Sequence, residues 1–148
     1  MDKNISLQAI QNARKIHEEQ MTKIEDAIAG NFVEDPTKPI KTECTFGMWL
    51  YDENLHVKEI LGAQFFNTIE TNHTKWHNEY LEVFNILFKN QKKQGFLSKM
   101  MKTKAIDPME LDRAKAYYAD LKITSAELLK IVDASQRRMD AMSEAKFR

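Results

Sequence analysis

FFNTIETNHTKWHNEYLEVFNIL, residues 65–87, is the segment with the clearest structural signal in this 148-residue chain. Apolar residues and two histidines recur in it at intervals of three and four, which is the spacing of one face of an α-helix. The residues of this face are Phe66, Ile69, His73, Trp76, His77, Tyr80, Phe84 and Leu87. The segment therefore predicts a long helix that buries this face, including both histidines.

A second periodic segment lies near the N-terminus. Apolar residues recur at helical spacing from Ile10 to Ile28, His17 lies among them, and Gly30 follows as a helix stop. The next stretch, residues 31–42, contains two prolines and cannot continue the helix, because proline lacks the N–H group and restricts the residue before it. We therefore expect an extended connection, followed by a short helix that begins near Cys44.

The C-terminal third predicts the longest helix. Asp107 and Pro108 resemble a helix start, with an N-cap followed by proline at the first helical position. The periodic pattern then persists from Tyr118 to Met142, so we predict a helix over about residues 108–146, roughly 55 Å long. The first helix would cover only some 40 Å of it. This overhang predicts pairing with a second subunit or continuation into a neighbouring module.

The predicted fold is all-α: an antiparallel four-helix bundle with an additional short helix that carries the cysteine. The length suits one domain over residues 1–148. The chain has 22 basic and 22 acidic residues, so its formal net charge is zero and gives no reason to expect a nucleic-acid partner. One cysteine cannot form an intramolecular disulfide, which favours a cytoplasmic location. The apolar runs are too short to span a membrane.

One segment departs from this even charge. Residues 89–104 contain six lysines around a small apolar cluster. Two interpretations stay open, namely a solvated connection or an amphipathic surface for an anionic partner.

Three of the four histidines are candidate metal ligands. His17, His73 and His77 fall on the apolar faces of two helices, where a polar group is costly unless it is satisfied. His73 and His77 are four residues apart, so they can reach one ion. If the two helices pack together, the imidazoles converge, and Cys44 supplies a fourth ligand. Three nitrogens and one sulfur favour Zn²⁺ over Mg²⁺ or Ca²⁺. His56, in a polar run, is predicted to lie at the surface.

The order of these residues resembles a known family. His17, then CTFGMWL at residues 44–50, then HTKWH at residues 73–77 is similar to the chemoreceptor zinc-binding (CZB) domain. Its signature is a histidine on the first helix, a Cys-x-Phe/Leu-Gly-x-Trp/Phe-Leu/Ile motif and a His-x-x-x-His pair. Residues 35–39 also look like the family's linker, and the resemblance covers residues 5–135. It implies a helical bundle that binds one zinc through three histidines and one cysteine, alone or fused to bacterial chemoreceptors and diguanylate cyclases.

A site with four protein ligands has no position for a substrate, so we expect a regulatory domain rather than an enzyme. Cys44 is the predicted redox-reactive ligand, because a zinc-bound thiolate is open to oxidants. Gly47 would let the backbone come close to the metal or to a neighbouring helix, and Trp49 would anchor the segment in the core or simply pack there. The resemblance implies sensing of zinc or of oxidants such as hypochlorous acid, with output to chemotaxis or cyclic-di-GMP signalling.

Two other functions stay open. The first is a structural zinc domain for dimerisation, in which Cys44 is never modified; a homodimer is the expected assembly in either case. The second is a hemerythrin-like di-iron carrier, which needs more histidines and bridging carboxylates than this pattern supplies.

Overall fold

The computed structural model of the chain describes residues 2–89 and 106–147. Within these residues the fold is all-α, as predicted. The elements in chain order are α1 (Lys3–Ile28), α2 (Thr45–Leu50), the 3₁₀ turn η1 (Glu53–Leu55), α3 (Val57–Leu61), α4 (Ala63–Leu87), α6 (Pro108–Ala141) and the 3₁₀ turn η3 (Glu144–Phe147). The predicted lysine-rich segment lies outside the described residues, apart from Lys89.

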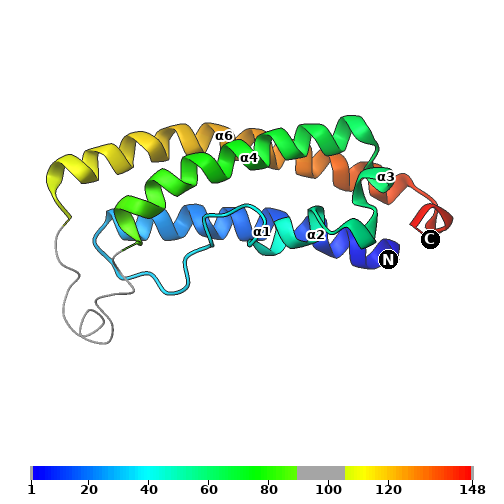
Figure 1. The fold of residues 1–148 in the computed structure, drawn as a ribbon, viewed down its shortest axis with the longest axis horizontal. Coiled ribbons are helices and arrows are strands. Elements are labelled where there is room, and N and C mark those ends of the chain that lie inside the picture. The colour runs from blue at the N-terminus through cyan, green and yellow to red at the C-terminus, as the bar shows by residue number, and fades with distance from the viewer. Residues whose placement is uncertain (1, 90–105, 148) are drawn as a thin grey trace.

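Three long helices form the body of the molecule (Figure 1). Helices α1 and α4 run in the same direction, and α6 runs antiparallel to both and packs along both (Figure 1). Since α1 and α4 point the same way, residues 29–61, which connect them in the sequence, must run back along the length of the bundle. This return segment carries the short helices α2 and α3 (Figure 1). It brings Cys44 beside His17, which lies near the middle of α1.

The predicted helix boundaries depend on local capping. The Asp2 carboxylate accepts the Ile5 N–H at 2.8 Å at the start of α1, and Gly30 adopts a φ of +91° beyond its end. Asp107 accepts the Met109 N–H at 3.1 Å, with Pro108 in the first turn of α6. These contacts satisfy N–H groups that have no partner within the helix. The predicted stop at Gly30 and the predicted start at Asp107 are confirmed.

The predicted end of the last helix is wrong by about a turn. Helix α6 ends at Ala141 instead of residue 146, and Met142 adopts an extended conformation with ψ of 146°. The Lys3 ammonium group donates to the carbonyls of Asp140 and Met142, at 2.8 and 2.9 Å, and so satisfies carbonyls that the helix end leaves free. The chain then turns, and Phe147 is buried.

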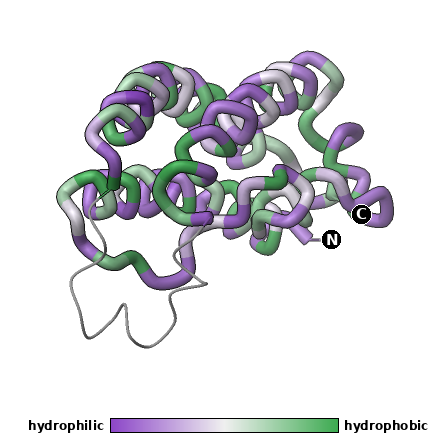
Figure 2. The backbone as a smooth tube through the Cα atoms, turned by 60° about the vertical axis from the view of Figure 1, so that its left-hand side comes forward, coloured by the Kyte–Doolittle hydropathy of each residue, from purple (hydrophilic) through white to green (hydrophobic). Residues whose placement is uncertain are grey.

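One apolar cluster fills the interior. Hydrophobic and hydrophilic residues alternate along each long helix, as Figure 2 shows, so each helix turns one face inward. Ile69, Trp76 and Tyr80 of α4 are fully buried, as their spacing predicts. None of the helices in residues 2–89 and 106–147 combines the length and apolar character that a membrane span requires. At 34 and 26 residues, α6 is longer than α1 by about 12 Å, so the predicted overhang is confirmed.

Candidate metal centre

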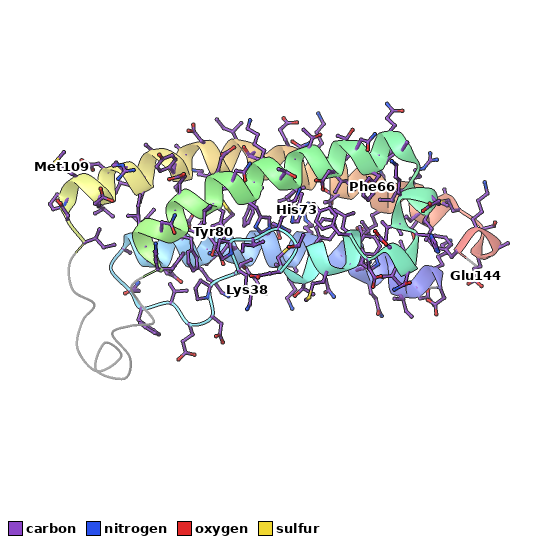
Figure 3. All side chains as sticks on the ribbon, in the orientation of Figure 1. Lys38, Phe66, His73, Tyr80, Met109 and Glu144 are labelled. Carbon is purple, nitrogen blue, oxygen red and sulfur yellow. The ribbon has the colours of Figure 1, made fainter. Side chains whose placement is uncertain are left out.

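The four predicted ligands converge at one buried point. His17 comes from α1, Cys44 is the N-cap of α2, and His73 and His77 lie one turn apart on α4. One ligand atom from each lies within 4.8 Å of the others, and all four side chains are buried. Figure 3 shows His73 on the side of α4 that faces α1. The predicted convergence of the two helices is therefore confirmed, and His56 is exposed, also as predicted.

Backbone carbonyls fix the orientation of two of the histidines. His17 Nδ1 lies 2.7 Å from the carbonyl oxygen of Ala13, and His77 Nδ1 lies 2.9 Å from that of Pro39. A carbonyl can only accept a hydrogen bond, so each Nδ1 carries a proton and each Nε2 keeps a lone pair. Both Nε2 atoms are buried and have no hydrogen-bond partner among the described residues. Such atoms are costly in an interior unless a cation or donor satisfies them.

Cys44 is held beside the third histidine. Its sulfur lies 3.4 Å from His73 Nε2 and accepts the Gly47 N–H at 3.2 Å, while the thiol donates to the Lys41 carbonyl at 3.4 Å. The cysteine thereby caps α2 through its side chain. A Cβ on Gly47 would lie only 1.7 Å from the Lys41 oxygen, so the close approach at Gly47 is to a carbonyl of the turn before α2 and not to a neighbouring helix as predicted.

Aromatic packing places α2 against the site. Phe46 is 2 % exposed and meets His17 and His73 edge-on, with ring centroids 5.9 and 5.2 Å apart. Trp49 is only partly buried and stacks on Phe46 at 5.9 Å. Phe46 and Leu50 are therefore the side chains of α2 that are buried in the core, while Trp49 packs against it, which agrees with the simpler of its two predicted roles.

Burial keeps the donors uncharged in the metal-free chain. It lowers the pKa of His17 and His77 to about 4 and that of His73 to about 2, because a charged imidazole is poorly solvated in the interior. The carbonyls of Ala13 and Pro39 act in the opposite direction but only partly offset this. Burial likewise raises the pKa of the Cys44 thiol. The imidazoles are therefore neutral near pH 7, which is the form that binds metals.

A polar network on the Nδ1 side of His73 was not predicted from the sequence. The Lys41 ammonium group donates to Glu70 Oε1 at 2.6 Å and to Thr74 Oγ1 at 2.8 Å, and the Tyr51 hydroxyl lies 3.0 Å from His73 Nδ1. Glu70 and Thr74 are four apart on α4 and flank His73, which is the one local signal of this arrangement. Lys41 and Tyr51 come from the return segment, so their part in it depends on tertiary packing.

The residues present fit a zinc ion. Three imidazole nitrogens and one sulfur form a soft, four-donor set of the kind that closed zinc sites use. Two of the nitrogens lack any other partner among the described residues. The cluster contains no carboxylate, although a di-iron centre would need several. Zn²⁺ is thus the cofactor that the chemistry and geometry of the site support.

Comparison with known proteins gave one match. The family model described as the chemoreceptor zinc-binding domain matches residues 17–84. This span begins at His17 and includes the other three positions of the cluster. Comparisons with curated proteins and with solved structures gave no match.

Proposed function

Residues 17–84 belong to the chemoreceptor zinc-binding family, and from this premise we propose that the chain is a regulatory module in which His17, Cys44, His73 and His77 hold one Zn²⁺. The observation that carries the proposal is the convergence of four buried nitrogen and sulfur donors, two of them without another partner in the described chain. When bound, Zn²⁺ keeps the Cys44 sulfur deprotonated and cross-links α1, α2 and α4.

The site supports a regulatory rather than a catalytic role. The four donors complete the usual tetrahedral shell of zinc, whereas catalytic zinc keeps one position for water or substrate. The side chains are also almost fully buried, with exposed fractions of 0 to 3 %. We therefore propose that the chain is not an enzyme.

Cys44 is the ligand that we propose to respond to the signal. Attack of its thiolate on hypochlorous acid forms an S–O bond and releases chloride, and the product is a sulfenic acid. The oxidised sulfur is a poorer donor, so α2 loses its bond to the metal and separates from His73. Zinc depletion would open the same segment. The proposed output is chemotaxis or cyclic-di-GMP control.

Native mass spectrometry tests the metal site. We expect the zinc-supplemented wild type to carry one zinc per chain, and Cys44→Ala to lose most of it. His56→Ala is the matched control, because this histidine is exposed and lies outside the cluster. A wild type that carries no metal after supplementation would contradict the proposal.

Oxidant-triggered release separates the switch from a purely structural zinc domain. We expect hypochlorous acid to release zinc into a chromogenic chelator, and a thiol reductant to restore binding. The reductant matters because the chain has eight methionines, and thiols alone do not reverse methionine oxidation. If zinc stays bound after the protein is treated with oxidant, the result would favour a purely structural zinc domain.

We also propose two features of the architecture. The return segment of residues 29–61, with α2 and α3, takes the place of the second helix in an antiparallel four-helix bundle of α1, this segment, α4 and α6. Two chains then pair along α6, whose outer face exposes Met109 and Ile123 and whose first turns extend past α1 (Figures 1 and 3). Sedimentation analysis of the wild type and Ile123→Asp tests this; a monomeric wild type would contradict it.

A further inference from the structure

We infer that Tyr51 is a positioning residue of the metal centre. Its hydroxyl oxygen accepts a hydrogen bond from the Nδ1–H group of His73, and its hydroxyl group donates a hydrogen bond to Glu70. This arrangement keeps the His73 proton on Nδ1 and leaves Nε2 free to bind the metal. The inference rests on the zinc site proposed above, and it assigns a role to a side chain outside the four ligands.

The two residues that flank helix α2 contact the two nitrogens of the same imidazole. Cys44, directly before the helix, places its sulfur 3.4 Å from His73 Nε2. Tyr51, directly after the helix, places its hydroxyl 3.0 Å from His73 Nδ1. The six-residue helix therefore spaces its two capping residues so that one group lies on each side of the ring.

His73 differs from the other two histidines in what holds its Nδ1. Backbone carbonyls face Nδ1 of His17 and His77 and can only accept, so they fix the proton there. The Tyr51 hydroxyl faces Nδ1 of His73 and can either donate or accept. If it donated, the His73 proton would sit on Nε2, and that nitrogen could not bind a metal. A second acceptor for the Tyr51 proton is therefore needed.

Glu70 provides that acceptor. Its Oε1 accepts hydrogen bonds from the Lys41 ammonium group at 2.6 Å and from the Thr74 hydroxyl at 3.0 Å, whereas its buried Oε2 has no hydrogen-bond partner among the described residues. Burial acts to raise the pKa of Glu70, but the interactions of the carboxylate with Lys41, Tyr51 and Thr74 outweigh it and lower the pKa. Burial and the interaction with Glu70 raise the pKa of Tyr51, so the phenol keeps its proton. Glu70 is therefore the inferred acceptor, because its buried Oε2 is free to take the hydrogen bond that the phenol donates.

Lys41 links this relay to the cysteine. Its ammonium group neutralises Glu70 and lies 5.3 Å from the centre of the Tyr51 ring, while its carbonyl contacts the Cys44 sulfur. Withdrawal of α2 would thus remove the sulfur donor and the Tyr51 contact from His73 together. Oxidation of Cys44 would in this way weaken a second ligand, because hydrogen bonding to the outer nitrogen increases the basicity of a metal-bound histidine.

The first test compares Tyr51→Phe with Tyr118→Phe. Tyr118 also donates to a glutamate, Glu25, but away from the cluster, so its variant controls for the loss of a tyrosine–glutamate hydrogen bond. We expect zinc competition assays to show an affinity lowered about tenfold or more for Tyr51→Phe and unchanged for Tyr118→Phe. Equal zinc affinity of Tyr51→Phe and the wild type would overturn the inference.

The second test asks whether Glu70 acts through Tyr51. Glu70→Gln should lower zinc affinity in the wild type but add little in the Tyr51→Phe background, because the relay is already broken there. Additive effects of the two substitutions would overturn the relay. Thermal unfolding followed by circular dichroism checks that both variants are folded.

A third measurement needs no metal. Nitrogen-15 NMR of the zinc-free wild type should show the His73 proton on Nδ1, and Tyr51→Phe should shift it toward Nε2. A wild type with the proton mainly on Nε2 would overturn the inference. Absence of zinc from the wild type in native mass spectra would instead overturn the proposed function itself, so the two failures are distinguishable.

Discussion

At the scale of single residues, Gly47 shows how closely the Cys44 segment is packed. A side chain there would place its Cβ 1.7 Å from the oxygen and 2.8 Å from the carbon of the Lys41 carbonyl. These are backbone atoms, so they cannot rotate aside as a side chain could. The glycine therefore allows the turn before α2 to press against the helix and to hold the Cys44 sulfur at the centre.

Gly47→Ala should lower zinc affinity about tenfold and the free energy of unfolding by about 2 kcal/mol, because α2 must move away from Lys41. Gly30→Ala is the control. It has open space around the new Cβ but a φ of +91°, so we expect a cost of about 1 kcal/mol without loss of zinc affinity. Denaturant titration and zinc competition measure both quantities. Wild-type zinc affinity in Gly47→Ala would contradict the argument.

At the scale of elements, α2 depends on its surroundings. It has six residues, whereas an isolated helix needs about 12 to 15 to be even marginally stable in water. Its stability comes from the cap by Cys44 and from the burial of Phe46 and Leu50. A bond between Cys44 and zinc would add to these few contacts, so α2 is the element most sensitive to the metal.

Chelation of zinc should therefore loosen α2 before the long helices. We expect faster hydrogen exchange in α2, above all at the Gly47 N–H that donates to the Cys44 sulfur, with little change in the central turns of α4 and α6. Exchange measured by NMR or mass spectrometry with and without chelator tests this. Identical rates in α2 under the two conditions would exclude its proposed movement.

Helix α6 should affect stability but not metal binding, since it contributes no residue to the cluster. Asp107→Ala removes the N-cap of this helix and should cost about 1 kcal/mol of unfolding free energy. Zinc affinity should stay as in the wild type. The exposed Asp112→Ala in the same helix is the control and should change stability by less than about 0.5 kcal/mol. A loss of zinc affinity in Asp107→Ala would show that α6 is coupled to the site.

At the scale of the whole molecule, the centre joins elements that otherwise share few contacts. Helix α6 packs extensively on α1 and on α4, but α1 and α4 touch each other much less. The cluster lies between α1 and α4, with α2 on its open side. A metal there would connect the return segment to both long helices, and its binding energy would become stability of the whole bundle.

Zinc should accordingly raise the free energy of unfolding by about 2.7 kcal/mol when its free concentration is 100 times the dissociation constant. Thermal or denaturant unfolding with buffered zinc measures this, and a chelator should reverse it. Cys44→Ser at the same zinc concentration should show a smaller increase, because sulfur is the better zinc ligand. An equal increase in the two proteins would mean that Cys44 does not bind the metal.

Local chemistry was enough to predict the three long helices and the four residues that cluster at the centre. Helical spacing placed His17, His73 and His77 on buried faces, since the period of a helix is a property of the backbone that any apolar pattern must follow. Capping residues fixed the start of the last helix at Asp107 and the stop after the first at Gly30 for the same local reason. The order of ligands and the motif at residues 44–50 identified the family that the match over residues 17–84 supports.

Contacts between distant residues were decided by the tertiary structure alone. Lys41 meets Glu70 across 29 positions, and Tyr51 meets His73 across 22, so no periodicity could reveal either pair. The end of α6 likewise depends on Lys3, at the other end of the chain. A sequence pattern shows which face of a helix is buried, because that depends on neighbours three and four residues away. Which groups then meet there depends on how the return segment crosses the bundle, and that crossing gives His73 its contacts with both Cys44 and Tyr51.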